Sequence, residues 1–156
     1  TDLKIVITAK PIDDNVKEKL IAEFGNLFLE RVYFTGMLDQ LYTPSIIKNA
    51  MFSMVFYKMD TPNNCFCEAN RFYQSLVFGI PVICGCNKPM KEIIDQYHCG
   101  IALKSDGSDL EEIKKAIKNL LNNYEYYSAN AVAIKDLFVW DEKKVLDLLV
   151  SNNKQK

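Results

Sequence analysis

Polar residues follow two apolar runs of the sequence, at the points where helices are expected to begin. Asn70 and Arg71 open one expected helix, and Gly85, Asn87 and Lys88 lie between an apolar run and the next helix. In a parallel α/β sheet such junctions meet at the carboxyl edge of the strands, where ligands bind. A helix N-terminus there has free N–H groups and a partial positive charge, which favour a phosphate. The pattern of the segment 67–103 therefore predicts that it forms one half of a nucleotide-binding site.

The elements that must position these residues follow from the alternation of apolar and polar residues along the chain. Five short runs rich in apolar, β-branched and aromatic residues predict strands, at residues 3–9, 31–35, 52–57, 80–84 and 100–103. Helical patterns separate these runs. Strands that alternate with helices predict one Rossmann-like, doubly wound parallel sheet of about five strands.

Residues that favour helix N-termini mark several of the helix starts. Asp13 or Asp14 can cap a helix that ends near residue 24. Pro44 after Thr43, and Pro89, each indicate a helix start, because proline suits the first turn of a helix. The spacing therefore places a helix after each of the first four strands.

The remaining helices are expected around the candidate site and at the end of the chain. Asn70 is expected to be the N-cap of its helix, and Ser108 with Glu111 to form a capping box. The helix after that box should bury one apolar stripe, made of Leu110, Ile113, Ile117, Leu120 and Leu121. Residues 58–68 are expected to form a polar loop, and residues 124–150 a last helix or helix pair.

The composition is that of one ordinary globular domain. The chain has 156 residues, of which 49% are hydrophobic and 25% charged, and this length suffices for a real core. A net charge of -1 argues against a nucleic-acid partner. No apolar run is as long as a membrane helix. We expect residues 1–150 to form the domain and 151–156 a disordered tail. Because Thr1 lies close to the first strand, we expect a fragment of a longer protein.

The five cysteines are Cys65, Cys67, Cys84, Cys86 and Cys99. An odd number without a secretion signal indicates reduced thiols in the cytoplasm. The two C-x-C pairs would lie on one edge of the sheet and raise the hypothesis of a metal site. Zinc sites use C-x₂-C spacing more often, and a cysteine at the end of a buried strand behaves as a small apolar residue. We therefore expect no metal.

The segment 69–83 resembles a sequence pattern of the GT-B glycosyltransferases. In the C-terminal, donor-binding domain of the retaining group 1 (GT4-like) branch, the pattern PNKFYEYLAAGKPVI forms a helix and a strand beneath the nucleotide-sugar. The matching residues are Ala69, Asn70, Arg71, Phe72, Tyr73, Gln74, Gly79, Ile80, Pro81, Val82 and Ile83. Weaker similarity extends to residues 32–36, 91–94, 100–101 and 138–142, so it covers nearly the whole chain.

The resemblance implies a role for each candidate residue. Gln74 stands where the family has a glutamate that binds the ribose, and Arg71 stands where a lysine lies near the donor phosphates. The family's loop after the fourth strand, here Gly85 to Met90, reaches the diphosphate through backbone N–H groups. Lys88 and Pro89 replace two family glycines, so one N–H donor is missing and Lys88 offers a charge instead. Gly36 and Met37 fall where the family holds the base.

The function implied by the resemblance is donor binding in a glycosyltransferase of hexosyltransferase type. Such an enzyme transfers a sugar from a UDP- or GDP-sugar to an acceptor hydroxyl, and it usually needs no metal or other cofactor. The acceptor-binding N-terminal domain is absent from this sequence, so we expect the fragment alone to be inactive. The expected location is the cytoplasm, and any membrane contact, at the inner face, would be made by the missing part. No residue is assigned a catalytic role.

Two alternatives remain. A phospho-acceptor receiver domain also has five parallel strands, and Asp13, Asp14, Asp60 and Lys104 roughly answer its need for acidic residues and a lysine. Those positions do not match the required spacing well, and the segment 71–81 would be unexplained. A GT-B-like sugar-nucleotide epimerase would share the donor-binding half.

Overall fold

The structure, a computed structural model, describes residues 2–10 and 12–139. The chain divides into two compact units, one of residues 1–46 and one that begins at Ile47. The single domain of residues 1–150 remains a prediction. The expected tail at 151–156, and the expected helical segment beyond residue 139, lie outside the described residues.

The first unit contains a parallel strand pair and two helices. Strand β1 (Ile5–Ile7) pairs with β2 (Val32–Phe34). Helix α1 (Asp14–Phe24) begins as predicted, because the Asp13 side chain accepts a hydrogen bond from the backbone N–H of Asn15. Helix α2 (Asn26–Arg31) was not predicted; Gly25, at φ 58°, separates it from α1. Helix α3 (Thr43–Lys48) begins at the predicted residue.

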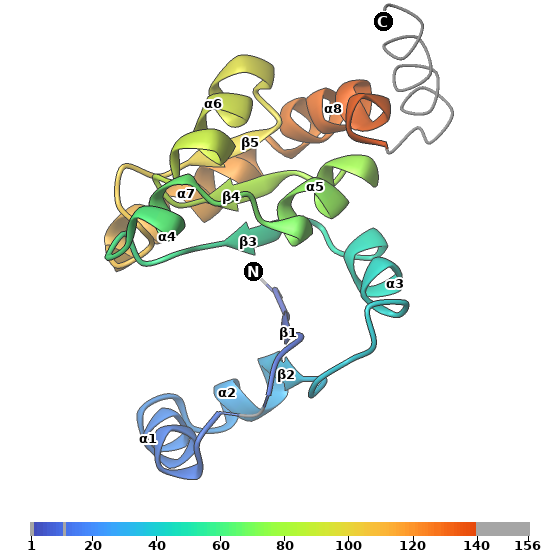
Figure 1. The fold of residues 1–156 in the computed structure, drawn as a ribbon. Coiled ribbons are helices and arrows are strands. Elements are labelled where there is room, and N and C mark those ends of the chain that lie inside the picture. Colours follow the sequence, from blue (N-terminus) through green and yellow to red (C-terminus); the bar gives the residue numbers. More distant parts are fainter. Residues whose placement is uncertain (1, 11, 140–156) are drawn as a thin grey trace, which may run out of the picture. The chain divides into compact units, whose positions relative to one another are not determined.

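The second unit contains a parallel sheet of three strands, β3 (Ser53–Val55), β4 (Val82–Cys84) and β5 (Gly100–Ala102), in the order β3-β4-β5 (Figure 1). Every residue of the central strand β4 is buried, which explains its uninterrupted apolar sequence. The predicted strands and their parallel direction are confirmed. In the described residues they are hydrogen-bonded as a pair and a triple, and one continuous five-stranded sheet stays a prediction.

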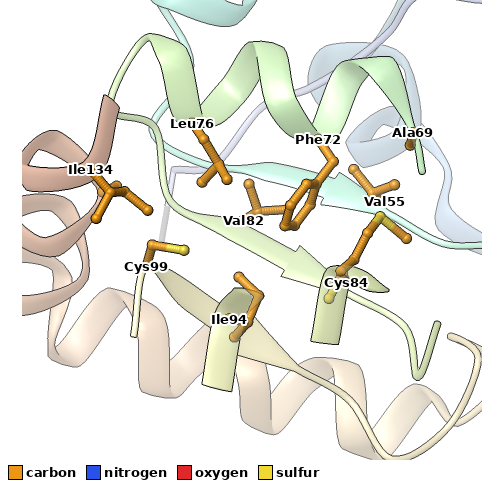
Figure 2. Packing of buried hydrophobic residues seen from close by; sticks show 11 residues of the cluster. Val55, Ala69, Phe72, Leu76, Val82, Cys84, Ile94, Cys99 and Ile134 are labelled. Carbon is orange, nitrogen blue, oxygen red and sulfur yellow. The ribbon is translucent and has the colours of Figure 1, made fainter. Parts of the chain in front are cut away.

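Helices cover both faces of the three-stranded sheet. On one face, Val82 and Cys84 pack with buried residues of α5 (Asn70–Val77), α6 (Lys88–Tyr97) and α8 (Tyr124–Ile134). Figure 2 shows Phe72 and Leu76 of α5 pointing toward Val82. On the other face, Ile83 packs with Ala116 and Leu120 of α7 (Leu110–Asn122). This arrangement confirms the α/β, Rossmann-like fold class, because side chains of a strand alternate between two helix-covered faces.

Three local predictions about helix starts and loops are wrong. The N-cap of α5 is Ala69, and Asn70 is already its first helical residue. The N-cap of α7 is Asp109, whose carboxylate accepts the N–H groups of Glu111 and Glu112, so Ser108 forms no capping box. The polar loop at 58–68 contains a short helix, α4 (Pro62–Phe66).

The stripe predicted for α7 is only partly correct. Ala116 and Leu120 are its buried residues, and Ile113 and Ile117 pack against the same core. Leu110, the first helical residue, is 69% exposed. After α8 the chain forms a 3₁₀ helix, η1 (Lys135–Phe138). Within the described residues, no helix is long and apolar enough to cross a membrane.

Candidate functional site

The carboxyl edge of the three-stranded sheet carries two helix N-termini. Because β3, β4 and β5 are parallel, the segments that follow them leave the sheet at one edge. Helix α5 begins after β3 and α4, and helix α6 begins after β4. The two helices therefore direct their positive ends to the same edge of the sheet.

The N-terminus of α5 is left without a side-chain cap. Its N-cap is the buried Ala69, whose carbonyl accepts the N–H groups of Phe72 and Tyr73 at 2.9 and 3.4 Å. The N–H groups of Asn70 and Arg71 have no acceptor among residues 2–10 and 12–139. These two donors are therefore available to an anion.

The N-terminus of α6 is built around the buried side chain of Asn87, which is 1% exposed. Its Oδ1 accepts the N–H of Met90 at 3.4 Å, and its Nδ2 donates to the carbonyls of Asn64 and Cys67 at 2.7 and 3.0 Å. The side chain ties α6 to α4 and to the segment that leads into α5. Asn87 thus shapes the loop with its amide, and only its backbone remains for a ligand.

The loop from Gly85 to Met90 offers fewer backbone donors than its length implies. The N–H of Gly85 donates to Val55 and that of Cys86 to Ser105, at 3.2 and 2.9 Å, so these bonds extend the sheet beyond β4. Pro89 has no N–H. Within the described part of the chain, only the N–H groups of Asn87 and Lys88 in this loop are left without an acceptor.

Two cations stand beside these four free N–H groups. Arg71 and Lys88 are both exposed, and neither forms an ion pair with a carboxylate of the described residues. The Arg71 guanidinium lies over the ring of Tyr57, with its Cζ 5.3 Å from the ring centroid. A cation in the first turn of a helix opposes the helix dipole, so an anion bound here would relieve an unfavourable arrangement.

The carboxylates of the same edge are held by internal hydrogen bonds. Asp106 accepts hydrogen bonds from Ser108 and from the N–H of Met59, which lower its pKa below the usual value. Glu112 accepts hydrogen bonds from Ser105 and from the N–H of Lys104, with the same effect on its pKa. These carboxylates fasten the loops after β3 and β5, which line an open depression of about 530 Å³.

Gln74 lies on α5, one turn after Arg71, and it is half-buried. Because residues three apart are neighbours on a helix, Arg71 and Gln74 share a side of α5, away from the buried Phe72 and Leu76. Gly36 and Met37 belong to the first unit: Gly36 has φ 74°, and Met37 is 72% exposed. The second unit therefore brings together the candidates on α5 and α6, whereas Gly36 and Met37 lie in the first unit.

The cysteines divide between core and surface. Cys84 and Cys99 are buried in the core (Figure 2), and burial raises their pKa values to about 12 and about 11, so both are protonated thiols. The described residues contain no group of three or more His, Cys, Asp or Glu side chains that could hold a metal ion. Cys67 donates to the carbonyl of Asn64 at 3.8 Å.

Sequence reasoning assigned no role to two side chains at this edge. Tyr57 holds Arg71, and Glu68 accepts a hydrogen bond from the hydroxyl of Tyr73. Burial, with that bond, raises the pKa of Tyr73 to about 12. Tyr57 lies at the end of an apolar run, a position that predicts a core residue, and the sequence contains no signal of its contact with Arg71. Helix α4 had a signal, since Pro62 follows Thr61 as Pro44 follows Thr43.

Comparison with known proteins identifies the fold. No protein-family model and no curated protein matches the sequence. Three similar solved structures are Alr3699/HepE from Anabaena in complex with UDP, sucrose-phosphate synthase from Thermosynechococcus elongatus, and WaaG, a glycosyltransferase involved in lipopolysaccharide biosynthesis. Their TM-scores are 0.70, 0.68 and 0.60, their sequence identities 13%, 17% and 13%, and they cover 99%, 99% and 85% of this chain.

These structures are GT-B glycosyltransferases, so the chain has a GT-B glycosyltransferase-like fold. The chain spans 41%, 38% and 34% of the lengths of the three matched chains. This structural similarity favours a GT-B-like fold over the fold of a receiver domain.

Proposed function

We propose that the chain is the donor-binding part of a glycosyltransferase and binds the diphosphate of a nucleoside diphosphate sugar at the ends of α5 and α6. The observation that carries this proposal is a set of four N–H groups, of Asn70, Arg71, Asn87 and Lys88, that have no acceptor among the described residues. Two cations that form no ion pair with those residues accompany them. The likeness to a structure solved in complex with UDP supports the same assignment.

The arrangement suits a leaving nucleoside diphosphate. Negative charge builds up on the diphosphate when the bond to the sugar breaks, and preorganised N–H groups and cations stabilise such charge. The guanidinium of Arg71 can make two parallel hydrogen bonds to phosphate oxygens, whereas Lys88 acts as a point charge. The proposed reaction is hexosyl transfer with retention from a UDP- or GDP-sugar to an acceptor hydroxyl. The acceptor would be bound by a second domain, so this chain alone would bind donor without turning it over.

Donor binding is tested directly by a thermal-shift screen of UDP, GDP, their sugars, and free uridine and guanosine. A ligand that binds only the native state at about ten times its Kd stabilises by about 1.4 kcal/mol, which raises Tm by about 3–6 °C for a chain of this size. We expect shifts with the diphosphates and smaller ones with the nucleosides, because the free N–H groups and cations recognise phosphate. No shift with any nucleoside diphosphate at millimolar concentration would refute the assignment.

A second measurement tests whether Gln74 contacts the ribose. In Gln74→Glu, a carboxylate replaces an amide and makes charge-assisted hydrogen bonds with the ribose hydroxyls, so we expect ribonucleotide binding to tighten by roughly 1 kcal/mol. The 2′-deoxynucleotide should gain less, because it offers one hydroxyl fewer. Isothermal titration calorimetry with both ligands measures the difference. Equal responses of the two ligands would show that residue 74 does not touch the sugar.

A further inference from the structure

Of the two cations in the proposed site, Arg71 is the one whose guanidinium is held by another side chain, that of Tyr57. Its guanidinium lies 5.3 Å from the centroid of the Tyr57 ring. Tyr57 follows β3 by two residues and packs, partly buried, against the core beneath α5 and α6. The core therefore fixes the ring, and the ring holds the guanidinium beside the carboxyl end of β3.

The backbone of Arg71 is fixed independently of Tyr57. Its carbonyl accepts the hydroxyl of the buried Ser75 at 2.8 Å, and that hydroxyl also lies 2.8 Å from Oγ of Ser53 on β3. The start of α5 is thus fastened to the sheet even without the stacked ring. Removing the ring should therefore free the side chain of Arg71 while leaving its backbone in place.

We propose that Tyr57 is a positioning residue for the diphosphate: its ring preorganises the Arg71 guanidinium at the free N–H groups of α5. This inference rests on the proposed function. An unsupported arginine would lose side-chain entropy when it binds phosphate, and a guanidinium already stacked on an aromatic ring loses less. The phosphate contact and the ring contact do not compete, because the ring attracts the cation through its π face, whereas the phosphate oxygens accept hydrogen bonds from the guanidinium N–H groups.

The test compares two variants of the 156-residue chain. In Tyr57→Leu, which removes the ring, the Kd for UDP or GDP should rise about two- to fivefold, the range that an exposed cation–π contact supports. Tyr57→Phe keeps the ring and should bind like the parent. The affinity for uridine or guanosine should not change in either variant, because a nucleoside has no phosphate for Arg71.

A double-mutant cycle shows whether Tyr57 acts through Arg71. In an Arg71→Ala background, Tyr57→Leu should cause no further loss of diphosphate affinity. The matched control is Tyr126→Leu, which removes an exposed tyrosine of α8. That helix lies at the opposite edge of the sheet, where its Asn130 donates to the carbonyl of His98 just before β5. The control should leave the Kd unchanged.

Three results would overturn the role of Tyr57 and leave the proposed function intact. The first is that Tyr57→Leu lowers diphosphate affinity as much in the Arg71→Ala background as in the parent. The others are that Tyr57→Leu lowers the affinity for nucleosides and for diphosphates equally, or that Tyr57→Phe lowers diphosphate affinity as much as Tyr57→Leu. A different result would refute the proposed function, and this inference with it. That result is a parent chain that binds no nucleoside diphosphate. NMR would then still show whether Tyr57 holds Arg71, because the Arg71 side-chain resonances would shift in Tyr57→Leu and not in Tyr57→Phe.

Discussion

Gly100→Ala is expected to destabilise the second unit by about 3 kcal/mol or more, because the added methyl group would overlap backbone atoms. A Cβ at Gly100 would overlap the carbonyl oxygen of Val82 and lie 2.8 Å from its backbone N and C. Gly100 pairs with Val82 in the register of β4 and β5. The clash is with the backbone of the central strand, which no side-chain rotation relieves.

Thermal unfolding of the parent and the variant measures this effect, and we expect Tm to fall by roughly 6 °C or more. Gly25→Ala is a suitable control. A Cβ at Gly25 has no atom within 4 Å, but its φ of 58° is unfavourable for alanine. With ψ at −138° the backbone lies outside the left-handed helical region, so the expected cost is about 1–3 kcal/mol from backbone strain, without any steric overlap. A Gly100→Ala variant as stable as the parent would contradict the close pairing of β4 with β5.

Asn87→Ala is expected to have the second large effect, a destabilisation of the second unit by about 3 kcal/mol. The substitution removes the N-cap of α6, worth about 1 kcal/mol. It also leaves the part-buried carbonyls of Asn64 and Cys67 without their donor, which costs about 1–3 kcal/mol. Denaturant unfolding of the parent and the variant gives the difference in the free energy of unfolding.

Two variants separate the cap from the amide donors. Asn87→Ser keeps an oxygen that can cap α6 but loses the two donated hydrogen bonds, so its cost should be about 1 kcal/mol smaller than that of Asn87→Ala. Asp109→Ala removes the exposed N-cap of α7, whose carboxylate accepts two N–H groups, and should cost about 1 kcal/mol. If Asn87→Ala cost no more than Asp109→Ala, the buried amide would not hold α4 to α6.

The loop between β4 and α6 shows what local sequence patterns predict poorly. Both the strand at residues 80–84 and the helix after it were predicted from the sequence, and Pro89 does lie in the first turn of α6. The number of free donors in the loop between them was not predictable. It depends on Gly85 and Cys86 pairing with Val55 and Ser105, which lie far away in the sequence.

The sequence by itself determined the order of the five strands and of the longer helices, the parallel direction of the strands, and the two strand–helix junctions with their polar residues; the short helices α2 and α4 were not predicted. The predicted features follow from periodicity and from helix-start signals such as Asp13 and Thr43, which act within one or two turns of chain. Only the tertiary structure decided that the amide of Asn87 is buried in backbone contacts and that Arg71 lies over Tyr57. The physical reason is that such contacts join residues 14 to 23 positions apart, which only the packing of helices onto the sheet brings together.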